Sequence, residues 1–418
     1  MSKKVVIAIS VVFSVVVLAG LGVLIWWLVS DSDSNEIVTI ILEGEGFENV
    51  TYTAAFTRIP ATGEIFWWFF PSKAGVSKPI LLFLGSITGL PHSFLLNFGE
   101  IGPLDFDLNA RNDSLVMDNL VQVLQSFYNI NGNYSDAPLY IYEQGDGSHL
   151  AVPLTIRLTN DENYKNKLKG LFLGNPIIAP ALVLTKLGFY LEELAMIDGD
   201  GRIVTEEFSN SVNSLVSEQK LEEAFDQFIT LGSVINNNAG SIAANLGRIV
   251  EKLTPESERD YFGQNLYYER VVPSNIDMKR FMETVIAPSL GISGNVNYDE
   301  SRNSTLYALR SIYMENYVDK VEQILNSTSV TVTIFNGNLD AVANTPGQLE
   351  WINNLKWPGN TEFTQAARQT LIINKQIEGY FRESSRLNFY WINVAGQSTL
   401  LDNPVATKKM LKRITRLS

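Results

Sequence analysis

The sequence contains no cysteine and only two histidines, His92 and His149, among its 418 residues. The absence of cysteine excludes disulfides, thiolate metal sites, iron–sulfur clusters and a cysteine nucleophile. Any mechanism that needs an imidazole base must use one of the two histidines. We therefore expect no cofactor and no metal centre in this protein.

Positive charge is also scarce, because 32 Lys and Arg stand against 45 Asp and Glu, for a net charge of −13 at pH 7. A nucleic-acid binder presents a basic face, and no stretch of the chain supplies one, so nucleic acid is excluded as a partner. The 45% share of hydrophobic residues excludes wholesale disorder. The length suits one large α/β domain with an insertion, or two to three average domains.

An uncharged apolar run extends from Val5 to Val29 and follows Lys3 and Lys4. A run of about 25 apolar residues spans the hydrocarbon core of a bilayer. We therefore expect a transmembrane signal-anchor at residues 5–29, with residues 1–4 in the cytosol, a stalk at residues 30–36 and the remaining chain extracellular or lumenal. The alternative is a cleaved signal peptide, whose apolar part is usually shorter and ends at small residues.

Asn-x-Ser/Thr sequons, which permit N-glycosylation, occur five times. The candidate sites are Asn49, Asn112, Asn133, Asn303 and Asn326. Because the chain is rich in asparagine, a similar number arises by chance, and the sequons remain candidates only.

Short apolar runs after the stalk predict strands, and two intervening segments have the spacing of buried helix faces. The strands are expected at Ile65–Phe70, Ile80–Leu84, Leu139–Tyr142 and Leu171–Leu173, and the helices at Met117–Phe127 and Leu150–Leu158. We expect the first two strands to be adjacent. The alternation of strand, helix and strand predicts a parallel sheet.

The character of the sequence changes between residues 182 and 317, where charged amphipathic segments dominate. Helices are expected there at Glu206–Phe228, Ile242–Leu253 and Met278–Val285, and this predicts a helical cap inserted into a core of residues 37–181 and 318–418. Sheet signals return at Val330–Phe335 and Phe389–Val394, and a basic amphipathic helix follows at Thr407–Ile414.

Seven segments that cover nearly the whole chain after the stalk together resemble the serine carboxypeptidase family of α/β-hydrolases, especially its retinoid-inducible branch. They are Ile65–Ser72, Lys78–Pro91, Gly102–Leu108, Pro138–His149, Leu168–Pro180, Phe335–Gly359 and Leu387–Gln397. The stretch FNGNLDAVANTPGQLEWINNLKWPG is the most specific of them. The resemblance implies an α/β-hydrolase fold, with a mostly parallel central sheet and a helical cap. The activity that it implies is removal of C-terminal residues from peptides at acidic pH.

The resemblance also implies where the catalytic triad would stand, and two of its three positions carry unsuitable residues. The nucleophile position is Gly145, which has no side chain, although glycine fits the strained backbone of such an elbow. The base position, after Ala395 and Gly396, is Gln397, which has no titratable proton near neutral pH. The acid position retains Asp340, which we expect to bond Gln397 or backbone amides in a structural role.

The supporting positions implied by the resemblance have changed as well. The oxyanion positions are Ile87 and Asp146, and a carboxylate there opposes the negative charge that must develop. The positions that hold a substrate carboxylate in the family are Gly85 and Gln144. Because Gln144 still offers a hydrogen-bond donor, peptide binding stays open.

Three further candidates for chemistry are weaker. Ser148 and His149 are a conceivable relocated nucleophile and base, but adjacent residues on a helix point in different directions. His92 is expected in a loop, where a lone histidine is more often inert. The segment Met196–Phe208 matches five positions of a calcium-binding loop but begins with Met196, so we favour a plain turn.

One departure concerns the fold, because the family carries an additional strand where this sequence passes almost directly from Leu108 to Met117. A missing core strand would leave a gap in the sheet unless its neighbours pair with each other.

The functional expectation is a membrane-anchored, catalytically inactive relative of the serine carboxypeptidases that binds a peptide or protein partner in its cleft. Two alternatives stay open. One is a working hydrolase whose site is unrecognised, and the other is a scaffold that uses its outer surface.

Overall fold

The computed structural model describes residues 36–47, 50–60, 63–84, 113–238, 245–251, 277–292 and 309–417. Several predicted features lie outside these ranges, namely the segment 5–29, the sequons at Asn49, Asn112 and Asn303, and Gly85, Ile87 and His92. Among the described helices, none is long and apolar enough to cross a membrane.

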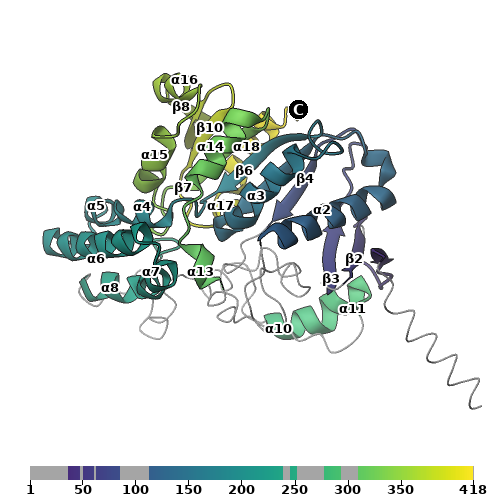
Figure 1. The fold of residues 1–418 in the computed structure, drawn as a ribbon, viewed down its shortest axis with the longest axis horizontal. Helices are drawn as coiled ribbons and strands as arrows, with labels where there is room; N and C mark the ends of the chain where they lie inside the picture. Colours follow the sequence, from purple (N-terminus) through teal and green to yellow (C-terminus); the bar gives the residue numbers. More distant parts are fainter. Residues whose placement is uncertain are drawn as a thin grey trace, which may run out of the picture.

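The described strands form two sheets (Figure 1). A three-stranded antiparallel sheet has the order β1-β2-β3, and a seven-stranded sheet has the order β4-β5-β6-β7-β10-β9-β8. In the larger sheet β4, β5, β6, β7 and β10 are parallel to one another. Strand β9 is antiparallel to β10, and β8 is antiparallel to β9. The strands are β1 (Val38–Ile41), β2 (Thr53–Ile59), β3 (Gly63–Phe69), β4 (Ile80–Leu84), β5 (Leu139–Gln144), β6 (Leu168–Gly174), β7 (Thr331–Gly337), β8 (Gln369–Ile373), β9 (Gln376–Glu383) and β10 (Leu387–Ile392).

The prediction that the strands now seen as β3 and β4 are adjacent is wrong. Strand β3 ends the smaller sheet, and β4 pairs only with β5 among the described strands. Trp67 and Phe69 of β3 instead pack edge-on against Phe127 of helix α2 (Asp113–Ile130). The boundary between the two sheets therefore falls between β3 and β4.

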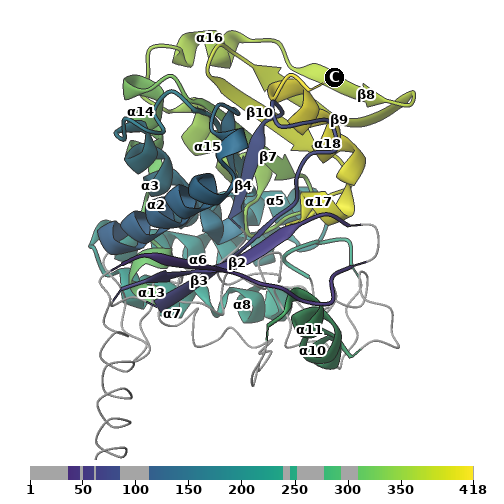
Figure 2. The same ribbon diagram turned by 90° about the vertical axis from the view of Figure 1, so that its right-hand side faces the viewer.

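Alternating side chains of the parallel strands fill two apolar layers, as the two-residue period of a strand requires. On one face Ile141 and Leu171 pack in a cluster with residues of α2, α3 (Ser148–Thr159) and α14 (Val318–Ser327). On the other face Tyr142 and Phe172 pack in a cluster that includes Met410 of α18 (Pro404–Ile414). Figure 2 shows α2 and α3 and the yellow α17 (Thr399–Asp402) and α18 on opposite sides of the strands. Helices α15 (Thr345–Asn353) and α16 (Asn360–Gln365) follow β7.

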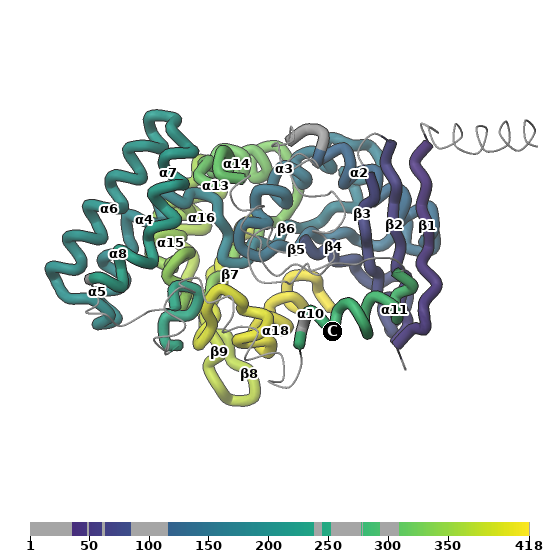
Figure 3. Tube along the Cα trace, turned by 90° about the horizontal axis from the view of Figure 1, so that it is seen from below, coloured from purple at the N-terminus to yellow at the C-terminus, as the bar shows by residue number. Residues whose placement is uncertain are grey.

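Most of the remaining described helices lie between β6 and β7 in the sequence. They are α4 (Pro180–Leu184), α5 (Leu187–Glu193), α6 (Gly199–Ser217), α7 (Leu221–Phe228), α8 (Leu231–Asn238), α10 (Met278–Phe281), α11 (Ala287–Leu290) and α13 (Arg310–Tyr313). Helices α4 to α8 and α13 share a second core around Leu191, Val212 and Phe225. Figure 3 shows α5 to α8 at the end of the molecule opposite β1. Where the cap begins and ends stays a prediction.

Two helix predictions need correction. Glu206–Phe228 is not one helix but two, because α6 ends before Gln219, whose φ of 62° cannot continue a right-handed helix. The part of Ile242–Leu253 that the structure describes forms turns, since the Asn245 side chain accepts hydrogen bonds from the Gly247 and Arg248 amides.

Candidate functional site

A tight turn joins the end of β5 at Gln144 to the start of α3 at Ser148. Gly145 stands at the start of this turn with φ of 69°, in the left-handed region that favours glycine. The Ser148 hydroxyl donates to the Gly145 carbonyl at 2.9 Å and accepts from the Ile177 amide at 3.1 Å, which fixes the turn. The strand–turn–helix arrangement expected of a nucleophile elbow is therefore present, with no side chain at the predicted nucleophile position.

Asp340 follows β7 and is completely buried. Its Oδ2 accepts a hydrogen bond from Asn175 Nδ2 at 2.7 Å, and its Oδ1 accepts from the amides of Val342 at 2.9 Å and Ala343 at 3.1 Å. Backbone amides are thus partners of Asp340, as expected, whereas its side-chain partner among the described residues is Asn175 and not Gln397. Sequence reasoning missed Asn175, although its place between Gly174 and Pro176 marks the end of β6.

Burial raises the pKa of Asp340 to about 7, and the hydrogen bonds from Ala343, Asn175 and Val342 oppose part of that rise. In an unfolded chain an aspartate has a pKa of about 3.9. The contribution of Asp340 to stability is therefore full below pH 4 and is lost as the pH rises through 7.

His149 has the opposite pH dependence. Burial, with a smaller effect of Lys320, lowers its pKa to about 3. Its stabilising contribution is present above the unfolded pKa of about 6.5 and is lost as the pH falls toward 3. The ring packs against Tyr317, with ring centroids 4.7 Å apart. Since the Ser148 hydroxyl bonds Gly145 and Ile177 instead, the two side chains do not form a nucleophile–base pair.

The predicted base and carboxylate-binding positions contact each other. Gln144 Nε2 donates a hydrogen bond to the Gln397 carbonyl oxygen. The Gln397 amide donates in turn to the Gly247 carbonyl at 2.6 Å. Gln144 is buried, and its side-chain amide, which could have donated to a peptide carboxylate, donates to Gln397 within the protein.

The segment from Asn245 to Glu251 crosses the ends of β7 and β10. The Ile249 amide donates to the Leu339 carbonyl at 2.9 Å, and the Ala341 amide donates to the Leu246 carbonyl at 2.9 Å. Together with the bond from Gln397 to Gly247, these contacts tie the segment to both loops that carry predicted triad positions. The segment therefore contacts the loop that carries Asp340 and the backbone of Gln397.

A small cavity adjoins the loop that follows Asp340. It has a volume of about 10 Å³ and is lined by Ile177, Tyr313, Val342 and Ala343, among others. That volume holds at most one water molecule and no peptide side chain.

Two buried carboxyl groups lie close to the elbow. Asp146 is 3% exposed and Glu143 is fully buried. Burial, and after it the charge of Asp146, raises the pKa of Glu143 well above its usual range. Sequence reasoning gave Glu143 no role, although a glutamate within the apolar strand LYIYEQ was a visible signal. The negative charge of Asp146 at this place disfavours an oxyanion.

The segment that partly matched a calcium-binding loop is mainly helical. Asp198 caps α6 by accepting a hydrogen bond from the Gly201 amide at 2.9 Å, and the residues from Gly199 onward belong to the helix. Within the described ranges, no three His, Cys, Asp or Glu side chains lie close enough to hold a metal ion.

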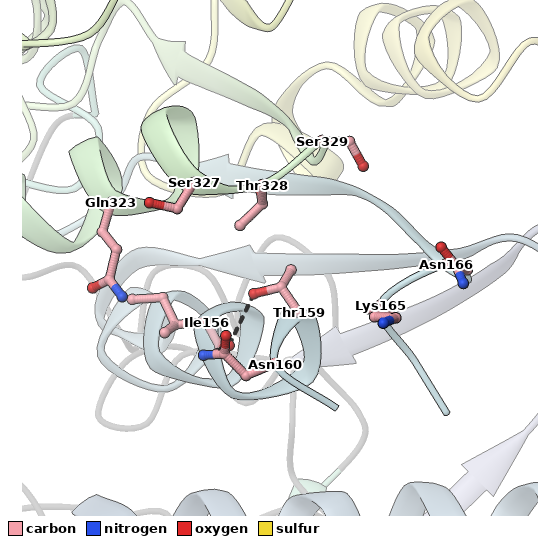
Figure 4. A pocket seen from close by; sticks show the side chains of 9 residues that line it. All are labelled: Ile156, Thr159, Asn160, Lys165, Asn166, Gln323, Ser327, Thr328 and Ser329. Carbon is pink, nitrogen blue, oxygen red and sulfur yellow. Dashed lines mark hydrogen bonds between the residues drawn. The ribbon is translucent and has the colours of Figure 1, made fainter. Parts of the chain in front are cut away.

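A larger polar cavity, of about 200 Å³, lies at the other end of α3 (Figure 4). It is lined by Ile156, Thr159, Asn160, Lys165, Asn166, Gln323, Ser327, Thr328 and Ser329. A 12-residue helix is about 18 Å long, so this cavity is remote from the elbow. The two sequons that the structure describes, Asn133 and Asn326, are both exposed.

Comparison with known proteins places these features in a family. The family model for serine carboxypeptidases matches residues 105–416. The chain is 24% identical to serine carboxypeptidase-like 51 of Arabidopsis thaliana, over 86% of this chain and 91% of the relative. It is also 24% identical to the retinoid-inducible serine carboxypeptidase of Rattus norvegicus, over 86% of this chain and 90% of the relative.

The fold agrees with that of a solved carboxypeptidase. A prohormone-processing carboxypeptidase from Saccharomyces cerevisiae superposes with a TM-score of 0.67 at 14% identity, over 92% of each chain. The predicted α/β-hydrolase fold with a mostly parallel central sheet is thereby confirmed. The chain therefore belongs to the serine carboxypeptidase family.

Proposed function

We propose that this protein is a non-hydrolytic member of its family that acts by binding a peptide or protein partner. The observation that carries the proposal is the elbow at Gly145, which has the backbone for a nucleophile and no side chain to form an acyl-enzyme bond. Gln397, at the predicted base position, cannot take a proton. In a serine protease, loss of the nucleophile or the histidine alone lowers kcat by about 10⁶-fold.

The contacts of the remaining triad position support the same proposal. Both carboxylate oxygens of Asp340 accept hydrogen bonds from the protein, as in a structural role. The segment Asn245–Glu251 covers the neighbouring loops. Because the Gln144 side chain, which could have held a peptide carboxylate, donates to Gln397 instead, we favour a partner that binds on the outer surface over a peptide in the former cleft.

The proposal includes a cellular location for the protein. The apolar segment 5–29, preceded by two lysines, would anchor it in a membrane with the family domain on the extracytoplasmic side. The exposure of Asn133 and Asn326 is compatible with glycosylation there.

A serine-reactive phosphonate probe tests the absence of a nucleophile anywhere in the chain. We expect intact-mass spectrometry of the full chain to show no phosphonate adduct, while an active serine carboxypeptidase treated in parallel is labelled completely. A single serine labelled to completion, with labelling lost in Asp340→Asn, would instead establish the alternative of a working hydrolase.

A further inference from the structure

Strand β1 is an apolar edge strand with no partner on its outer side among the described strands. Its side chains are unusually accessible, since Val38 is 39%, Ile40 is 40% and Ile41 is 50% exposed, and Ile37 just before the strand is 42% exposed. Consecutive residues point to opposite faces of a strand, so apolar surface is open on both faces.

The register shows which main-chain groups of β1 are available. The Leu42 amide donates to the Ala54 carbonyl at 2.9 Å, so Leu42 and, two residues away, Ile40 direct their backbone groups toward β2. The intervening residues Thr39 and Ile41 therefore direct their amides and carbonyls outward. A further strand would find donors and acceptors at the usual spacing.

Edge strands are normally protected by proline, lysine, bulges or a covering segment. Strand β8, the edge of the larger sheet, has a register shift between Leu371 and Ile372. Strand β1 pairs with β2 in an unbroken register, and its sequence, VTII, contains neither proline nor lysine. Within the part of the chain that the structure describes, this edge therefore lacks the devices that discourage strand addition.

The charged residues around β1 indicate what kind of partner would bind at this edge. Glu36, Glu43 and Glu45 are exposed and flank the apolar strand, and residues 36–47 contain no basic residue. A second copy of the chain is a poor partner, because an antiparallel copy that sets Thr39 opposite Ile41 would bring Glu36 of one copy near Glu43 and Glu45 of the other at both ends. Clustered like charges repel each other and weaken such a pair.

We propose that the outer edge of β1 is a docking site for an extended peptide segment whose apolar residues are flanked by lysine or arginine. The segment adds as a fourth strand, its main chain bonds Thr39 and Ile41, and its basic ends lie near the three glutamates. This inference rests on the proposed function and names the chemistry of the partner.

The test is a fluorescence-polarisation titration of the full chain in detergent micelles with labelled peptides. One peptide is Lys-Lys-Val-Thr-Val-Thr-Val-Lys-Lys, and its control replaces every lysine with glutamate. We expect the lysine-flanked peptide to bind about tenfold or more tightly than the control, and this preference to shrink as salt screens the charges.

Two variants at one position separate main-chain pairing from side-chain contact. Ile41→Pro removes an outward amide and is compatible with an edge strand, and we expect it to weaken binding about tenfold. Ile41→Ala keeps the amide and is expected to weaken binding only about threefold. Binding that is unchanged in Ile41→Pro would overturn the proposal.

Charge reversal provides a test that does not depend on how proline affects the fold. The double variant Glu43→Lys and Glu45→Lys should transfer the preference to the glutamate-flanked peptide. The double variant Glu193→Lys and Glu207→Lys, on α5 and α6 at the opposite end of the molecule in Figure 3, changes the net charge equally, is the matched control and should change nothing. An unaltered preference in the double variant would overturn the inferred chemistry.

Sedimentation of the same samples tests whether a second copy of the chain occupies the edge of β1 instead of a peptide. A dimer that Ile41→Pro abolishes would show that a second copy covers the edge, contrary to the proposal. Hydrolytic activity would contradict the proposed function and leave peptide binding at β1 intact, so the two failures are distinguishable.

Discussion

Replacing Asp340 with alanine is expected to lower the free energy of unfolding by about 3 to 5 kcal/mol. The substitution removes the acceptor for three donors, the side-chain amide of Asn175 and the backbone amides of Val342 and Ala343. Each buried donor left without a partner costs about 1 to 3 kcal/mol. Urea unfolding at pH 6, followed by circular dichroism, measures the loss.

Asp340→Asn is the matched control, because it keeps one carbonyl acceptor and cannot titrate. We expect Asp340→Asn to lower the free energy of unfolding by less than Asp340→Ala does. Between pH 4 and pH 7, the free energy of unfolding of this variant should fall less than that of the natural protein. This follows because the natural carboxyl, with a pKa of about 7, loses its stabilising contribution over that interval. An alanine variant as stable as the natural protein would refute the structural role of Asp340.

Replacing Gly337 with alanine is expected to cost about 3 kcal/mol or more, or to prevent folding. Gly337 ends β7, where the loop that carries Asp340 approaches the loop that carries Gln397. A Cβ atom at this position would lie 2.1 Å from the Gly396 carbonyl oxygen and 2.5 Å from that of Ala395. Because both obstacles are backbone atoms, relief requires the two loops to separate.

Gly132→Ala serves as the control for Gly337→Ala, since no atom lies within 4 Å of the added methyl group. Thermal unfolding of the two variants should show a large fall in Tm for Gly337→Ala and almost none for Gly132→Ala. Equal Tm values would mean that the close approach of the two loops does not contribute to stability.

The parts of the fold that sequence predicted are those governed by local pattern. The structure contains strands at the continuous apolar runs around Tyr142 and Leu171. It also contains helix α2, where the apolar residues have helical spacing. The separation of β3 from β4 was not predicted, because pairing depends on the partners that tertiary structure supplies. The turns at residues 245–251 were missed for a similar reason, since the Asn245 side chain competes with helical backbone bonds.

The candidate site was predictable where the family motif fixes positions along the chain. The assignments of Gly145, Asp340 and Gln397 to triad positions rest on this motif. The bond from Asn175 to Asp340 joins residues that are far apart in the sequence. The burial of Glu143 depends on the residues that surround it in the fold. Neither has a periodic signature, so only the three-dimensional arrangement reveals them.

The most direct measurement is hydrolysis of blocked dipeptides and activated esters by the purified full chain between pH 4 and pH 8, with Asp340→Asn as the comparison. We predict no turnover above that of the variant at any pH, because Gly145 offers no nucleophile and Gln397 no base. Turnover by the natural protein that disappears in Asp340→Asn would contradict the proposal of a non-hydrolytic family member.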